Sequence, residues 1–331
     1  ENVISLTVVT PSGEVVKTRQ KVRKASTGYE VTQLYIGAEG TLGVVTEVCI
    51  RVHMLQRCRA GVLCHFPEIK KAAEAVVSML KMSRGTLVRC ELLNAKMIEC
   101  TNKEYKTSLP CAPTLFLEFQ SNDFKGIQDE WRQIKILFEK FGAGGVKYSE
   151  DAKEFGNLWS ARRGCYFSTM KYRKNLKQQT KLDKNYITDV CVPVSRLAQC
   201  IAETEDDFGS IGFPCLICAH IADGNFHCMI PYQQHEKKRL KQAEQRLIER
   251  AVKAGGAVSG EHGVGIGKKP HICLEHGQAH IGLQKRIKHA LDPMLIMNPH
   301  KILDLDTNAP SGAPPPAAPN ARHQPAVSSK L

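Results

Sequence analysis

The sequence predicts an α+β protein, in which an antiparallel sheet is covered by helices. Two observations favour this class. Apolar runs typical of strands follow one another over residues 1–55, and from about residue 57 extended segments alternate with helices that have a single apolar face. Of the 331 residues, 42% are hydrophobic and 24% are charged, which excludes a fibre and a wholly disordered chain.

The first 55 residues contain two apolar runs, over 3–9 and 42–52, and Pro-Ser-Gly at 11–13 is a hairpin turn signal after the first. The chain opens directly in the first run, and this piece has too few elements to close a core alone. We therefore expect it to be the end of a domain that begins upstream of Glu1.

Two strand and helix units follow. The extended segments are 60–66, 87–93 and 115–119, and a helix is predicted after the first and after the third. The apolar positions that recur at helical spacing are Ile69, Ala72, Ala73, Val76, Val77 and Leu80 in the first helix and Ile127, Trp131, Ile134, Phe138 and Phe141 in the second.

A third helix is predicted to begin after Ser149, whose side chain is a plausible N-cap. On this helix Phe155, Leu158, Trp159 and Arg162 share one face, so an arginine points where the aromatic rings point. Two interpretations remain open. Arg162 either pairs with a core acid or binds the carboxylate of a substrate, for which a guanidinium is well suited.

The net charge of +13 admits nucleic acid, an anionic surface or an acidic substrate as a partner. Residues 162–184 contain eight Lys and Arg residues against one Asp, a balance of +7. Few aromatic residues interleave with them, so we expect a solvated loop and no nucleic-acid partner. No run of eighteen apolar residues is present, so no membrane span is predicted.

The 13 cysteines are scattered through predicted strands and helices, which favours reduced, buried thiols over a disulfide framework. Cys215 and Cys218 form a CxxC pair, the spacing of many zinc and redox sites. Residues three apart in a strand face opposite sides of the sheet, so two inert core thiols are favoured here.

A long helix is predicted over 234–254, ending at Gly255-Gly256. Its buried positions are Leu240, Ala243, Leu247 and Ala251. The last 25 residues, 307–331, hold six of the 16 prolines together with Gly, Ala and Ser. Such a composition predicts a disordered tail.

The segment 220–227, His-Ile-Ala-Asp-Gly-Asn-Phe-His, has the strongest local turn signal of the chain. With Asp223 and Gly224 at the centre of a two-residue turn, His220 and His227 fall directly opposite each other. Their Cβ atoms would then lie about 4.5–5.5 Å apart, which suits chelation of a metal. The alternative is two half-buried histidines that flank a turn.

A glycine-lined loop follows at 259–269, Ser-Gly-Glu-His-Gly-Val-Gly-Ile-Gly-Lys-Lys. It is neither a phosphate-binding Walker loop nor the dinucleotide fingerprint, because the glycine spacing differs from both. Its backbone could approach a planar ligand closely. Glu261 could complete a His, His, Glu metal site and His262 could serve as a base, the alternative being a flexible surface loop.

Six motifs in series resemble the FAD-linked oxidases of the vanillyl-alcohol-oxidase type, with the best match to the D-lactate dehydrogenase (cytochrome) family. The resemblance covers residues 1 to about 305, and six motifs in family order are far more specific than any one. The motifs are Tyr-Ile-Gly-Ala-Glu-Gly-Thr-Leu-Gly-Val-Val-Thr-Glu at 35–47, Leu-Trp-Ser-Ala-Arg at 158–162, Thr-Asp-Val-Cys-Val-Pro at 188–193, Asp-Gly-Asn-Phe-His at 223–227, Ser-Gly-Glu-His-Gly at 259–263, and Asp-Pro to Met-Asn-Pro at 292–299.

The resemblance implies four regions. Residues 1–56 would be the C-terminal part of an FAD-binding domain, and 57–279 a substrate (cap) domain. Residues 280–306 would be a helix and a segment that returns toward the FAD domain, and 307–331 the tail. The glycine-rich loops that cradle the FAD pyrophosphate would lie upstream, so we expect these 331 residues alone to bind FAD weakly or not at all.

The resemblance also implies the site. His220, His227 and Glu261 would hold zinc or manganese, and His262 would accept the proton of the substrate hydroxyl. Arg162 would bind the substrate carboxylate while hydride leaves Cα for the flavin N5. The residues expected beside the flavin are Gly40, Thr41, Gly43, Val44 and Asn298.

The implied reaction is FAD-dependent oxidation of a small D-2-hydroxy acid, best represented by D-lactate to pyruvate. Relatives that act on D-2-hydroxyglutarate have polar residues where this chain has Ile187 and Met229, and apolar residues there favour a monocarboxylate. Glu261 argues against an ether-lipid synthase. D-2-hydroxyglutarate, glycolate and a non-catalytic interaction protein remain alternatives, and the electron acceptor stays open.

Two positions depart from the family pattern: Ala222 and His300 stand where glycine is usual. The chain ends in Ser329-Lys330-Leu331, a tripeptide that peroxisomal import receptors recognise. We therefore expect a peroxisome or a related microbody such as a glycosome, with the mitochondrion of the D-lactate dehydrogenases as the alternative.

Overall fold

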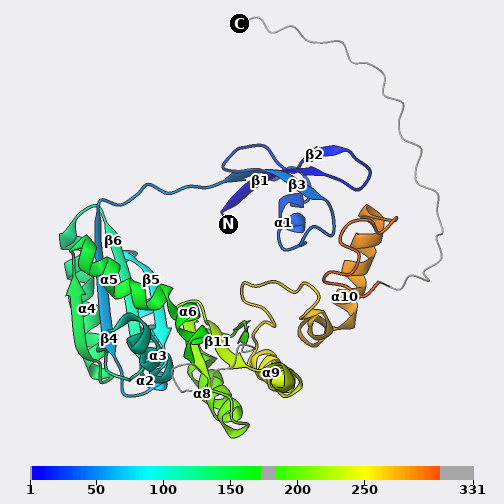
Figure 1. Ribbon diagram of the computed structural model, residues 1–331. Coiled ribbons are helices and arrows are strands. Elements are labelled where there is room, and N and C mark those ends of the chain that lie inside the picture. Colours follow the sequence, from blue (N-terminus) through cyan, green and yellow to red (C-terminus); the bar gives the residue numbers. More distant parts are fainter. Residues whose placement is uncertain (1, 173–183, 306–331) are drawn as a thin grey trace, which may run out of the picture.

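The computed structural model describes residues 2–172 and 184–305 (Figure 1). The expected tail and its final tripeptide lie outside the described residues, and so do residues 173–183 of the basic segment 162–184. The chain begins with a three-stranded antiparallel sheet in the order β2-β1-β3. The predicted turn at 11–13 is confirmed, because it joins β1 (Val3–Val9) to β2 (Val15–Lys17), and β3 (Val44–Ile50) corresponds to the second apolar run.

A larger sheet follows, in which every described pair of strands is antiparallel. This arrangement confirms the predicted fold class. In spatial order the strands are β7 (Gly144–Ser149), β4 (Cys58–His65), β6 (Thr114–Ser121), β5 (Leu87–Leu93), β10 (Leu216–His220), β11 (Asn225–Tyr232) and β8 (Lys184–Ile187), and β9 (Val190–Cys191) also pairs with β11.

Helices cover both faces of the large sheet, and each face has its own buried apolar cluster. The larger cluster lies under α2 (Ile69–Leu80), α4 (Phe124–Lys140), α8 (Val194–Ser210) and α9 (Lys237–Lys253), the last preceded by a 3-10 turn, η1 (Gln234–Glu236). The smaller cluster lies under α3 (Ala95–Tyr105), α5 (Ala152–Arg163) and α6 (Cys165–Met170). The candidate site is on this second face.

Most predicted helix faces are confirmed, with local differences. In α4, Ile127, Trp131, Ile134 and Phe138 are all buried. The buried face of α2 is rotated slightly from the prediction, because it uses Met79 while Leu80 remains 40% exposed. The helices α3 and α8 were not predicted.

The N-cap of α5 was also predicted wrongly: Asp151, and not Ser149, accepts the backbone N–H groups of Lys153 and Glu154. Ser149 is instead the last residue of β7. The prediction that Cys215 and Cys218 face opposite sides of the sheet is confirmed. Cys215 belongs to the larger apolar cluster and Cys218 to the smaller one.

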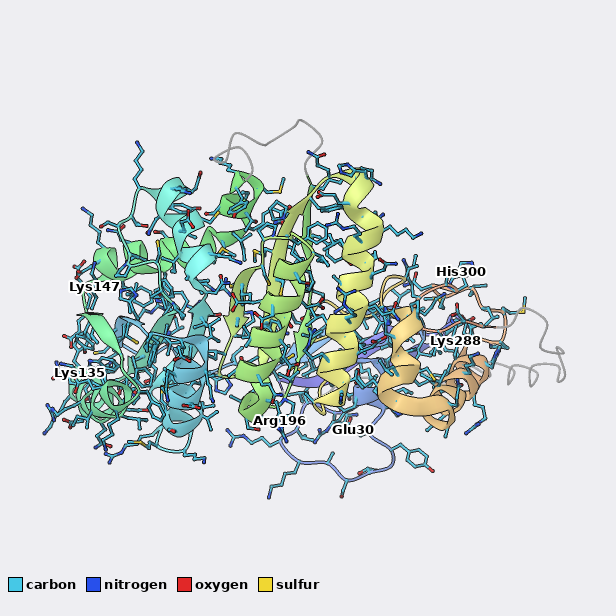
Figure 2. All side chains as sticks on the ribbon, turned by 90° about the horizontal axis from the view of Figure 1, so that it is seen from below. Glu30, Lys135, Lys147, Arg196, Lys288 and His300 are labelled. Atoms are coloured by element: carbon cyan, nitrogen blue, oxygen red, sulfur yellow. The ribbon has the colours of Figure 1, made fainter. Side chains whose placement is uncertain are left out.

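The chain returns to the small sheet through η2 (Lys269–His271) and α10 (Ile272–Leu291), which is interrupted at Gly277, where φ is +76°. Ile287 and Leu291 pack against the apolar cluster that β1 and α1 (Val31–Tyr35) bury. The buried Lys288 pairs with Asp292 and donates to the carbonyl of Thr41 at 2.7 Å. Figure 2 shows Lys288 and His300 at one end of the molecule, opposite Lys135 and Lys147.

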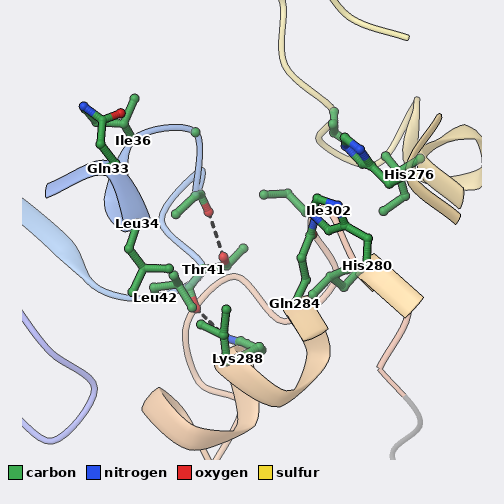
Figure 3. A pocket seen from close by; sticks show the side chains of 16 residues that line it. Gln33, Leu34, Ile36, Thr41, Leu42, His276, His280, Gln284, Lys288 and Ile302 are labelled. Carbon is green, nitrogen blue, oxygen red and sulfur yellow. Dashed lines mark hydrogen bonds between the residues drawn. The ribbon is translucent and has the colours of Figure 1, made fainter. Parts of the chain in front are cut away.

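A cavity of about 450 Å³ lies between α10 and the segment that contains α1 and Thr41 (Figure 3). His276, His280 and Gln284 line it from α10, and Leu34 and Leu42 from the other side. The rings of His276 and His280 stack with centroids 4.4 Å apart. Of the predicted site residues, Thr41 is the one that borders this cavity.

Candidate active site

The hairpin of β10 and β11 brings His220 and His227 together, although not in the predicted register. His220 pairs with Asn225, and His227 pairs with Cys218, so four residues rather than two connect the strands. The predicted direct opposition of the two histidines is therefore wrong. They are diagonal neighbours on one face, with ring centroids 5.6 Å apart, a spacing that still permits a shared ligand.

The register is shifted because the turn is held by chain outside the hairpin. Gly224 has φ +78°, and its carbonyl accepts the backbone N–H of Val192 at 2.9 Å. A Cβ added to Gly224 would lie 2.0 Å from the carbonyl oxygen of Val192, so the close approach requires glycine. The sequence signal correctly placed a turn here, but the contact with Val192 determines how many residues the turn contains.

Glu261 joins the two histidines from the glycine-lined loop. Its Oε1 lies 3.0 Å from His227 Nε2 and 3.6 Å from His220 Nε2. One ligand atom from each of these three residues lies within 4.8 Å of the others, an arrangement that can hold a metal ion. Two imidazole nitrogens and a carboxylate with an open position are the donor set of catalytic zinc sites, so the residues present fit a divalent metal.

Each histidine is oriented through its other ring nitrogen. His220 Nδ1 lies 2.9 Å from Glu91 Oε1, and His227 Nδ1 lies 3.1 Å from the carbonyl oxygen of Thr188. Both contacts leave Nε2 as the nitrogen that faces Glu261. A hydrogen bond at the second ring nitrogen is the usual way in which proteins orient a histidine that binds a metal. The hydrogen bond with Glu91 raises the pKa of His220 against the opposing effect of burial, whereas burial lowers the pKa of His227.

Asp189 holds the loop that carries Glu261 and His262. Its buried carboxylate accepts the backbone N–H groups of residues 260, 261 and 262 and the hydroxyl of Ser259, and the Nζ of Lys268 lies 3.0 Å away. Burial acts to raise the pKa of Asp189, but these hydrogen bonds and the lysine charge outweigh it and lower the pKa.

A second trio of possible ligands, Asp189, His227 and His262, lies in the same region. The oxygens of Asp189 are already occupied by the donors of the loop, and Asn225 donates to it at 2.8 Å. A metal there would have to displace several of these hydrogen bonds. The trio with Glu261, whose side chain is 51% exposed, is therefore the better metal site.

His262 stands beside the metal trio. Its ring stacks on His227 with centroids 4.9 Å apart, and its Nε2 lies 3.6 Å from Glu261 Oε1. The side chain is 43% exposed, so a substrate can reach it. Its backbone N–H donates to Asp189 at 3.0 Å, which fixes the chain at this point of the loop.

Arg162 extends from α5 toward the same region. Its Nη2 lies 3.0 Å from Glu91 Oε2, so the first of the two sequence interpretations, a pairing with a core acid, is present. The side chain is 18% exposed, and its buried Nε has no hydrogen-bond partner among the described residues. Arg162 also lines a cavity of about 480 Å³ with Glu91 and His220, so a ligand carboxylate could still approach it.

The segment between α1 and β3 contacts the loop through Glu39. Its carboxylate accepts the backbone N–H groups of Val264 at 2.7 Å and Gly265 at 2.8 Å. Asn298 Nδ2 donates to the carbonyl of Glu39 at 2.6 Å, and Glu39 itself has φ +49°. The segment from which a flavin contact is expected is thus attached to the loop that carries His262.

Of the other expected flavin-side residues, Gly40, Thr41 and Gly43 lie in this segment between α1 and β3, and Val44 is the first residue of β3. Thr41 is buried, and a Cβ on Gly43 would lie 2.7 Å from Val8 Cγ1. Val44 is 52% exposed, and Asn298 and His300 are exposed as well. His300, which stands where glycine is usual in the family, thus has its side chain at the surface.

Sequence reasoning missed Glu91, Glu39 and Lys268. The one local signal for Glu91 is that a carboxylate stands within the predicted strand 87–93, where most of its neighbours are apolar. The partners of Glu39 lie 225 and 226 residues further along the chain, so no local pattern could reveal them.

Fold and site together define a domain of a flavin-linked oxidase. Residues 55–302 match the family described as "FAD linked oxidases, C-terminal domain", and the chain belongs to this family. D-lactate dehydrogenase [cytochrome] 1, mitochondrial, of Saccharomyces cerevisiae is 35% identical over 94% of this chain and 53% of its own length. D-lactate dehydrogenase [cytochrome], mitochondrial, of Arabidopsis thaliana is 33% identical over 92% and 52%.

This chain therefore spans about half the length of these two relatives. The crystal structure of p-cresol methylhydroxylase with substrate bound superposes with a TM-score of 0.69 over 92% of this chain and 65% of that one. At 15% identity this likeness shows the fold alone. Among the described residues, no helix is both long and apolar enough to cross a membrane.

Proposed function

We propose that the full-length protein oxidises a small D-2-hydroxy acid with FAD as its cofactor, D-lactate to pyruvate being the preferred reaction. The observation that carries this proposal is the convergence of His220, His227 and Glu261 beside Arg162 and His262. The two D-lactate dehydrogenases support it by similarity.

In this proposal each residue has one task. Arg162 binds the carboxylate of the substrate, and His262 takes the proton of the α-hydroxyl at its Nε2. His220, His227 and Glu261 hold a divalent ion, zinc or manganese. A divalent ion held there would lower the pKa of the hydroxyl, and bound FAD would supply the acceptor for the hydride from Cα. Gly40, Thr41, Gly43, Val44 and Asn298 remain the proposed flavin-side residues.

A monocarboxylate is supported by the residues beside His227. Met229 and Ile187 are directly paired across β11 and β8; Met229 belongs to the apolar cluster on the face of the site, and Ile187 packs against it. A second carboxylate placed there would lose its hydration without gaining a charged partner. D-lactate has no second carboxylate, whereas D-2-hydroxyglutarate has one, so this face favours D-lactate.

The test uses the full-length protein with FAD under anaerobic conditions. We expect D-lactate to bleach the flavin absorbance, with L-lactate inactive and D-2-hydroxyglutarate and glycolate slower. A colourless, metal-free protein would refute the proposal and favour a non-catalytic interaction protein. Faster reduction by D-2-hydroxyglutarate or glycolate would keep the chemistry and change the substrate.

We further propose import into peroxisomes or glycosomes through Ser329-Lys330-Leu331, which lies outside the described residues. A fluorescent fusion that leaves this tripeptide free should colocalise with a peroxisomal marker and lose that localisation when the tripeptide is deleted. Mitochondrial fluorescence that is unaffected by the deletion would contradict the proposal.

A further inference from the structure

Glu91 is a buried carboxylate that contacts both halves of the proposed site. It lies on β5 and is 5% exposed, on the sheet face that α5 covers. Its Oε1 is 2.9 Å from His220 Nδ1, and its Oε2 is 3.0 Å from Arg162 Nη2. A buried carboxylate is unfavourable unless it is paired, so these two contacts determine where Glu91 lies.

We propose that Glu91 is a positioning residue that sets the geometry of the metal site and of the substrate arginine at the same time. This inference rests on the proposed function. The two residues it touches are 58 positions apart in the chain and come from different elements, α5 and β10. A single carboxylate thus fixes a proposed metal ligand relative to the proposed carboxylate-binding group.

The metal half of the argument concerns His220. With Nδ1 held by Glu91, the ring presents Nε2 toward Glu261, 3.6 Å away. His227 receives the same support from the carbonyl of Thr188, a backbone group. Because the support of His220 is a side chain, it can be removed by substitution. Loss of such outer partners weakens metal binding.

The substrate half concerns Arg162. Glu91 occupies one terminal nitrogen of the guanidinium and thereby fixes the plane of the group. The buried Nε has no hydrogen-bond partner among the described residues, although a buried donor without a partner is unfavourable. Glu91 therefore orients Arg162 through Nη2. The side chain is still 18% exposed, so part of it remains open to the carboxylate of a ligand in the cavity that both residues line.

The experiment compares Glu91→Gln with Glu130→Gln in the full-length holoenzyme. Glu130 is a matched control, because it is 3% exposed, accepts hydrogen bonds from Ser83 and Thr86, and lies on α4 at the opposite face of the sheet. Affinity for Zn²⁺ or Mn²⁺ alone is measured by competition with a chromogenic chelator. KM and kcat for D-lactate are measured at saturating metal.

Glu91→Gln should weaken metal binding about 10- to 100-fold and raise KM roughly tenfold, with a smaller change in kcat. Glu130→Gln should lower the melting temperature but change neither the metal affinity nor the KM for D-lactate. If Glu91→Gln is insoluble, Glu91→Asp, which keeps the charge but shortens the side chain by one methylene, should show the same two losses.

The two possible failures can be distinguished. If metal affinity and KM of Glu91→Gln equal those of Glu130→Gln, while the wild type binds metal and oxidises D-lactate, Glu91 is a structural residue and the inference alone is overturned. A wild type that binds no metal and oxidises no D-2-hydroxy acid overturns the inference together with the proposed function.

Discussion

Replacing Asp189 by asparagine should release the loop that carries Glu261 and His262. The substitution preserves size but removes the charge and turns one acceptor into an N–H₂ donor. Oδ2 of Asp189 accepts the hydroxyl of Ser259 at 2.7 Å and three consecutive backbone N–H groups at 2.9–3.1 Å. In the variant several of these donors would face another donor, and Lys268 would lose its counterion.

The expected loss of stability follows from burial. The side chains of Asp189 and Lys268 are 1% and 12% exposed, so the pair is screened little by water. Removing one partner of a buried ion pair costs about 3–5 kcal/mol. The pKa of Asp189 is lowered in the folded state, so its contribution is present above the unfolded pKa of about 4 and is lost as the pH falls toward the folded value.

The assay is urea denaturation of wild type and Asp189→Asn from pH 7 downward, together with metal affinity. We expect the difference in unfolding free energy to be constant down to about pH 4 and to shrink below it. Asp207→Asn is the control, since Asp207 pairs with Arg246 and Arg250 away from the loop and should leave metal affinity unchanged. A loss for Asp189→Asn below about 1 kcal/mol, with unaltered metal affinity, would refute the anchoring role.

Other substitutions separate the parts of the site. Glu261→Gln should weaken metal binding by at least about tenfold at an unchanged melting temperature, because the side chain is 51% exposed; chelator competition measures this. Glu39→Ala should accelerate hydrogen exchange of the backbone N–H groups in 259–269 that Glu39 now binds, and unchanged exchange would contradict that contact. Gly43→Ala should cost about 1–3 kcal/mol through overpacking, whereas Gly144→Ala, which has open space around it, should be tolerated in the same thermal melts.

Much of the fold is present in local patterns. The apolar face of α4 predicted a helix because that face is buried against the sheet. The run 87–93 predicted the strand β5, which is part of the same sheet. The helix α8, which was not predicted, buries residues at the same helical spacing, so the sequence contains a local pattern for it as well.

The site is less local than the fold. The trio of His220, His227 and Glu261 was predicted from its motifs, and these residues do come together. The contacts that orient them and Arg162 were not predicted. Glu91 and His220 are 129 residues apart in the chain, and the turn between the histidines was misjudged because Val192 binds it from outside. Such contacts depend on how the sheet brings distant strands together, which periodicity does not encode.

The most direct test of the central claim is the anaerobic flavin spectrum of the full-length protein with D-lactate, before and after removal of divalent metal by a chelator. If His220, His227 and Glu261 hold a metal that acts on the hydroxyl, bleaching should be lost after chelation and return when Zn²⁺ or Mn²⁺ is added. Bleaching at an undiminished rate in the metal-free protein would contradict the account.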